Sequence, residues 1–182
     1  KSKFSDINFD LTSEDSWPIK DKTLKIIYCS HTIEYLNDNF VLAFMKQAYK
    51  KLKKGGIIRL ICPDIDIFLD AYKRKDEYVF KLNNNQPLNE PLKYSLTQSL
   101  LRVFAGRCCD FNNSNISTSD EVIKKDLKSL SVENFLNKYS NMISIEEVRN
   151  FPREHKTWFN KKKVIKMLNA AGFENIYESG YC

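Results

Sequence analysis

Two short apolar runs flank one amphipathic segment in the first third of the chain. Residues 24–29 (LKIIYC) are almost continuously apolar, and residues 57–62 (IIRLIC) repeat the pattern. Such runs are typical of strands buried on both faces of a parallel sheet. Helical spacing predicts a helix between them, because apolar residues recur every three or four positions; these are Val41, Phe44, Met45, Ala48, Tyr49 and Leu52.

Helix-capping residues, glycines and a proline mark the ends of these predicted elements. Asn37 and Asp38 are good helix N-caps, Gly55 and Gly56 are expected to end the helix, and Pro63 ends the second strand because it has no amide proton. Strand, helix and strand then form a right-handed crossover unit of a parallel sheet, which binds ligands beyond the carboxyl ends of its strands. The segments CSH (29–31) and CPD (62–64) lie at those ends.

Helical patterns dominate the middle of the chain. We predict helices over 65–78, 94–105, 122–130 and 132–139, a loop over 82–91, and a short helix begun by the capping box Ser144 and Glu147. Residues 64–150 thus read as a helical insertion that covers one end of the sheet. Residues 1–63 and 151–182 form the sheet core, which closes with a helix over 164–171, a C-cap at Gly172 and a strand over 173–177. One α/β domain over 1–182 accounts for the whole pattern.

Composition restricts the class of protein. No apolar run approaches membrane-spanning length, and the five cysteines show no paired metal spacing. We therefore expect no membrane span, no metal, and a reducing, cytoplasmic compartment. The net charge of +6 comes from lysines spread over predicted helices. Solvated helix faces explain them without nucleic acid, although a polyanionic partner is the alternative reading.

In order along the chain, NFDLTSEDSWP (8–18), CSHTIEYL (29–36) and LKKGGIIRLICPD (52–64) resemble segments of the class I S-adenosylmethionine-dependent methyltransferases. Residues 155–176 are similar to the closing helix and strand of that family. The resemblance implies a Rossmann-like, three-layer α/β/α sheet, S-adenosylmethionine as cofactor, and methyl transfer to a small-molecule or glycan-type acceptor.

The glycine-rich cofactor loop of that family is not found among the five glycines of this chain. We therefore expect the distal part of a methyltransferase domain, with its first strands and that loop upstream and a seventh strand downstream. The alternative is a non-catalytic methyltransferase-like module that pairs with another chain, and a homo-oligomer is compatible with either reading.

The resemblance also assigns residues to the cofactor site. It places Asp10 and the Leu11 amide against the adenine, where a carboxylate accepts from the amine and an amide donates to a ring nitrogen. The alternative is that Asp10 caps its own turn with Thr12 and Ser13. The remaining cofactor contacts line the methyl end of the crevice and are Cys29, Ser30 and His31.

His31 is a catalytic candidate that contacts the acceptor or orients a water, since imidazole titrates near neutral pH. Alternatively it caps the next helix, with Glu34 reaching back to its amide. Tyr35 stands where the family usually has histidine, so no role is carried over from that missing imidazole.

The resemblance places the acceptor beside residues from two segments. Pro63 and Asp64 flank its entrance, although they also suit a strand stop and a helix N-cap. His155 is the second catalytic candidate, and Arg153 beside it suits an anionic or sugar-like acceptor. The alternative is that this segment, which also holds Lys156 and Trp158, is an exposed basic loop.

Overall fold

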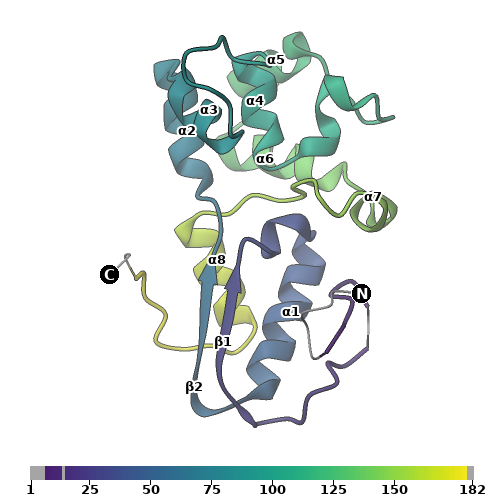
Figure 1. The fold of residues 1–182 in the computed structure, drawn as a ribbon, viewed down its shortest axis with the longest axis vertical. Helices are drawn as coiled ribbons and strands as arrows, with labels where there is room; N and C mark the ends of the chain where they lie inside the picture. Colours follow the sequence, from purple (N-terminus) through teal and green to yellow (C-terminus); the bar gives the residue numbers. More distant parts are fainter. Residues whose placement is uncertain (1–6, 14, 180–182) are drawn as a thin grey trace.

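The computed structural model describes residues 7–13 and 15–179, which form a mixed α/β fold (Figure 1). Strands β1 (Leu24–Ser30) and β2 (Leu52–Ile61) pair in parallel, and helix α1 (Asp38–Lys51) connects them. The predicted strand–helix–strand unit is therefore confirmed. Figure 1 shows this unit in the lower half of the molecule and helices α2 to α6 in the upper half.

Helix α1 forms where its pattern predicts but ends before the two glycines. The Asn37 side chain caps it by accepting a hydrogen bond from the Phe40 amide at 3.0 Å. Its last carbonyls, on residues 50 and 51, accept bonds from the amides of Lys22 and Thr23, so strand pairing follows directly. The prediction that the glycines end the helix is wrong: they lie inside β2, at a break in strand register that Gly55 accommodates with φ of +73°.

Only one face of the sheet is buried by described residues. Cys29 and Leu60 pack toward α1 and α8, whereas the opposite face leaves Ile26, Tyr28 and Ile57 exposed by 66%, 62% and 55%. The prediction that both strands are buried on both faces is wrong, because α1 and α8 cover a single face.

This exposure predicts that the second face contributes little to the stability of the chain itself. Tyr28→Thr is expected to change the free energy of unfolding by less than about 0.5 kcal/mol, because it removes few buried contacts and keeps β propensity. Urea denaturation followed by circular dichroism measures the change. A loss above about 2 kcal/mol would mean that this face is covered in solution.

The insertion is helical, as predicted. Its helices are α2 (Ile65–Arg74), α3 (Glu77–Asn83), α4 (Leu96–Arg102), α5 (Asp120–Ser129), α6 (Val132–Asn141) and α7 (Ile145–Asn150). The helix predicted over 65–78 is two helices, because Lys75 turns into the left-handed region and Asp76 caps a new start. The helix over 94–105 shortens to α4, and three single-turn 3₁₀ helices lie at Ile33–Tyr35, Gly106–Cys108 and Asp110–Asn112. Across 7–13 and 15–179, no helix has the length and apolarity to cross a bilayer.

Two hydrophobic clusters form the core of the part of the chain that the structure describes. One lies inside the helical insertion and the other between β1, β2, α1 and α8 (Lys161–Ala170). Phe40 packs against both, and the consecutive residues Trp158 and Phe159 belong one to each. The chain between α7 and α8 therefore joins the two clusters.

The strand predicted over 173–177 is wrong. Gly172 follows α8 with φ of +102°, and residues 173–179, the described part of the segment after it, carry no strand. A groove of about 710 Å³, lined by β2, α8 and residues 173–179, separates it from the outer edge of β2. Phe173 instead packs edge-on against Tyr49 of α1, with ring centroids 5.3 Å apart. The contacts of Phe173 therefore anchor this segment to α1 and to the cluster that α1 shares with the strands.

Candidate functional site

Four of the predicted site residues follow the carboxyl ends of the two parallel strands. Ser30 ends β1, His31 comes next, and Pro63 and Asp64 lie just beyond β2. The His31 amide donates to the Ile61 carbonyl at 2.9 Å, which holds the two strand ends together. His31 itself has φ of 48°, a left-handed conformation that few residues with a side chain adopt.

The His31 ring meets a buried carboxylate. Its Nδ1 lies 3.1 Å from Oε1 of Glu34, and the side chains of the pair are 62% and 2% exposed. The alternative that Glu34 reaches back to the His31 amide is wrong, because Glu34 contacts the ring. Thr32 precedes the 3₁₀ helix over 33–35 without a side-chain capping bond.

The second oxygen of Glu34 has no hydrogen-bond partner in the described structure. Glu34 lines a small cavity between the sheet edge and the insertion, together with Pro63, Val103 and Trp158 among other residues. A buried polar atom left unpaired costs about 1–3 kcal/mol. Glu34 is therefore a poor choice for packing alone.

His155 lies close to this pair. Its Nδ1 is 2.6 Å from the Val103 carbonyl, and its ring packs edge-on against Tyr35 with centroids 4.9 Å apart. Burial lowers the pKa of His155 below its usual value, against the opposing effect of the Val103 carbonyl and of Glu34. Because a carbonyl oxygen only accepts, Nδ1 of His155 is the donor in this bond.

The other candidates around His155 do not form one basic pocket. Arg153 is exposed, but Lys156 is fully buried and its Nζ donates to the Phe151 carbonyl at 2.7 Å. Burial lowers the pKa of Lys156 to about 8. Trp158 points into the helical cluster and donates from Nε1 to Asn137 at 3.0 Å.

Asp64 caps helix α2. Its Oδ1 accepts from the Asp66 amide at 3.0 Å, which is the N-cap geometry given as the alternative role. The next amide, on Ile65, donates to the Phe159 carbonyl at 2.8 Å and fixes the start of α2 against the sheet core. Pro63 and Asp64 thus form a rigid border of the strand ends.

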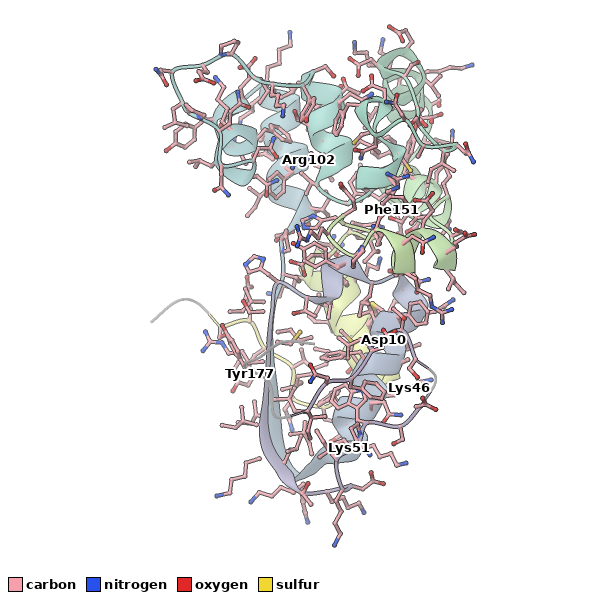
Figure 2. All side chains as sticks on the ribbon, turned by 45° about the vertical axis from the view of Figure 1, so that its right-hand side comes forward. Asp10, Lys46, Lys51, Arg102, Phe151 and Tyr177 are labelled. Carbon is pink, nitrogen blue, oxygen red and sulfur yellow. The ribbon has the colours of Figure 1, made fainter. Side chains whose placement is uncertain are left out.

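Asp10 caps its own turn. Its Oδ1 accepts from the amide and the hydroxyl of Thr12, both at 2.8 Å, and these bonds, the amide first, lower the pKa of Asp10. Arg149 of α7 donates to the Thr12 carbonyl at 3.2 Å, while Leu11 packs on the sheet cluster. Figure 2 shows Asp10 beside α1, on the other side of the strands from Tyr177. None of the contacts of Asp10 in the described part of the chain reaches His31 or Ser30.

The cysteines near the site are inert. Cys29 is buried in the sheet cluster, and burial raises its pKa. Burial also raises the pKa of the Cys62 thiol to about 12. A thiol with so high a pKa is not a nucleophile near neutral pH. Cys29 therefore contributes packing and backbone to the strand end.

The sequence reading missed the importance of Glu34 and Lys156. Glu34 lies three residues after His31, a spacing that brings side chains together on one turn, and this was the available signal. The burial of Lys156 has no such signal, because it results from how the insertion closes over residues 151–156. Within 7–13 and 15–179, no group of three or more His, Cys, Asp or Glu residues is arranged to hold a metal.

Comparisons with known proteins add no relative: no family model, no curated protein and no solved structure matches this chain. The interpretation of the site therefore rests on its own geometry and on the sequence segments described above.

Proposed function

We propose that this chain takes part in S-adenosylmethionine-dependent methyl transfer to a small-molecule or glycan-type acceptor. One observation carries the proposal: a parallel strand–helix–strand unit presents His31, backed by a buried carboxylate, at the carboxyl edge of its sheet. Ligands of open α/β sheets bind at this edge. The ordered resemblance to class I methyltransferases supports the same reading and a Rossmann-like sheet.

Residues from two segments would form part of such a site. Ser30, His31 and the backbone of Cys29 would border the methionine end of the cofactor, and Asp10 with the Leu11 amide would face the adenine. When bound, S-adenosylmethionine supplies an electrophilic methyl group on its sulfonium. The chain would contribute mainly by positioning, which can remove several kcal/mol from a bimolecular barrier.

The acceptor would lie on the other side of the strand ends. Pro63 and Asp64 would form its border, and His155, whose ring packs edge-on against Tyr35, would complete it. Arg153 is exposed nearby in sequence and suits an anionic or sugar-like group. The insertion would then cover the acceptor side of the edge.

A second candidate function is a non-catalytic module that pairs with another chain. The exposed sheet face with Ile26, Tyr28 and Ile57 favours it, since parallel sheets are normally covered on both faces. This reading expects a stable complex and no cofactor binding. A monomer by light scattering would count against it.

Cofactor binding is tested by thermal denaturation with S-adenosylmethionine. At about 100 times the dissociation constant, a bound ligand adds about 2.7 kcal/mol, or a rise of roughly 5–10 °C in Tm for a chain of this size. We expect His31→Ala and Asp10→Ala to reduce the rise. Tyr177→Ala is the matched control, because Tyr177 is 78% exposed and lies away from Asp10.

Absence of any shift at millimolar S-adenosylmethionine would contradict cofactor binding by this chain. The same titration with S-adenosylhomocysteine, the expected product, checks that a shift reports the nucleoside site and not methylation of the protein.

A further inference from the structure

We propose that Glu34 is a positioning residue for His31, and that the two form a dyad whose free ring nitrogen removes a proton from an acceptor hydroxyl. The dyad stands on the geometry of the chain alone. Its use on an acceptor rests on the proposed methyl transfer.

The contrast in burial is the first argument. The Glu34 side chain is almost fully buried, while the His31 ring 3.1 Å from it is largely exposed. A surface ion pair would expose both partners, and a core pair would bury both. Here a buried carboxylate holds one nitrogen of a ring that is largely exposed.

The backbone around His31 is the second argument. His31 adopts φ of 48°, and its amide is tied to the Ile61 carbonyl at the end of β2. The hydroxyl of Thr32 donates to the Ser30 carbonyl at 3.1 Å and fixes the turn on the other side. Unusual backbone conformations that are held by several bonds concentrate at functional sites.

The unpaired oxygen of Glu34 is the third argument. Oε2 is buried beside a small cavity and has no partner among the described residues. A residue selected for packing at this position would not carry such an atom. A residue selected to hold His31 needs only the oxygen that contacts the ring.

The dyad fixes the tautomer of the imidazole. Nδ1 lies against Glu34 Oε1, and because an ionised carboxylate can only accept, Nδ1 carries the hydrogen and Nε2 keeps the lone pair. When Nε2 takes a proton, the carboxylate stabilises the imidazolium that forms. Glu34 thus acts through His31 and not on the substrate.

Proton removal by His31 requires an acceptor group that loses a proton as it is methylated. As an acceptor oxygen forms a bond to the methyl carbon, the carbon–sulfur bond breaks, its electron pair goes to sulfur, and the O–H proton goes to Nε2. The products are a methyl ether and S-adenosylhomocysteine, and the exposed ring then releases the proton to water. A hydroxyl acceptor, such as that of a sugar or phenol, fits this requirement.

The tautomer can be measured on the full chain without any ligand. The chain has only two histidines, so long-range ¹H–¹⁵N spectra of the ring nitrogens, with His31→Ala for assignment, resolve both. For neutral His31 we expect mainly the Nδ1–H form, whereas free histidine prefers Nε2–H. A wild-type His31 that is mainly Nε2–H would overturn the dyad.

Substitution of Glu34 gives the second readout. In Glu34→Leu the Nδ1–H form of His31 should fall to the proportion seen in free histidine. His155 is an internal control for folding, because its own Nδ1 bond goes to Val103 and should persist. An unchanged His31 tautomer in a folded Glu34→Leu would also overturn the proposal.

Reactivity of Nε2 tests the base. Diethyl pyrocarbonate modifies unprotonated imidazole, and peptide mass spectrometry separates the two histidines. We expect His31 to react several-fold faster than His155, and Glu34→Leu to slow His31 several-fold. Equal rates at His31 in both chains would contradict a role for Glu34 in presenting Nε2.

These results are separate from cofactor binding. If His31 is mainly Nδ1–H but S-adenosylmethionine gives no thermal shift, the dyad is supported and the proposed methyl transfer is contradicted. If S-adenosylmethionine gives a thermal shift but His31 is mainly Nε2–H, cofactor binding is supported and the dyad is contradicted.

Discussion

Phe159→Ala is expected to lower the free energy of unfolding by about 4 kcal/mol. The ring is 1% exposed in the sheet cluster, and truncating a buried phenylalanine typically costs about 3–5 kcal/mol through lost burial and the cavity that remains. The carbonyl of the same residue holds the first amide of α2, so a shift of the backbone here would reach the insertion. Urea denaturation followed by circular dichroism measures the loss.

Tyr177→Ala is the matched aromatic control, and its exposed ring should contribute less than about 0.5 kcal/mol. A loss below about 1.5 kcal/mol for Phe159→Ala would contradict the packing described for the sheet cluster.

Tryptophan fluorescence tests whether the two clusters unfold together. The chain has two tryptophans, and Trp17 packs on the sheet cluster while Trp158 lies in the helical one. Fluorescence of Trp17→Phe and Trp158→Phe therefore reports each cluster separately. We expect coincident transitions, because Phe40 and the 158–159 pair connect the clusters. Two separate transitions would show two independent folding units.

Lys156→Met is expected to stabilise the chain more near pH 7 than near pH 10.5, by a difference of about 3 kcal/mol. Burial lowers the pKa of Lys156 from 10.5 to about 8. The unfolded chain therefore binds the Lys156 proton more tightly than the folded chain does. Wild-type stability rises as the pH increases from about 8 to 10.5, and below about pH 8 the full cost of burying the ammonium lowers the stability of the folded chain. Methionine carries no such proton and removes the penalty.

The experiment compares wild type and Lys156→Met by urea denaturation at several pH values. The variant lacks the hydrogen bond to the Phe151 carbonyl at every pH. The change with pH in the stability difference between the two chains therefore reports the ammonium charge of Lys156. Lys128→Met is the control, because Lys128 is exposed on α5 and its curve should stay parallel to wild type. A Lys156→Met curve parallel to wild type would mean that the ammonium is solvated or paired in the folded chain.

The sequence predicts the local elements well. The strand–helix–strand unit, the helical insertion and the Ser144 cap, which accepts from the Glu147 amide at 3.2 Å, all follow from spacing and capping chemistry within a few residues. The capping box is only half formed, because Glu147 is ion-paired with Arg107 of the insertion. Local signals therefore specify helix starts, while long-range partners decide where the side chains go.

Tertiary features could not be predicted in the same way. An apolar strand such as β1 looks the same whether one face or both are covered, so the exposure of Ile26 and Tyr28 had no sequence signal. Gly55 suits a helix C-cap or a strand bulge, and the register between β1 and β2 decides between them. The candidate site shows the same limit: the strand ends place His31, but only the closure of the insertion buries Glu34.

The open sheet also affects how the protein behaves at high concentration. Apolar β segments with unpaired edges can template pairing between copies and grow into aggregates. The strands carry Lys25, Lys53, Lys54 and Arg59, all exposed, and like charges on neighbouring copies repel. Salt screens this repulsion over about 10 Å at 0.1 M. Colloidal stability in low-salt buffer, with clouding as salt rises, is therefore the expected solution behaviour of this chain.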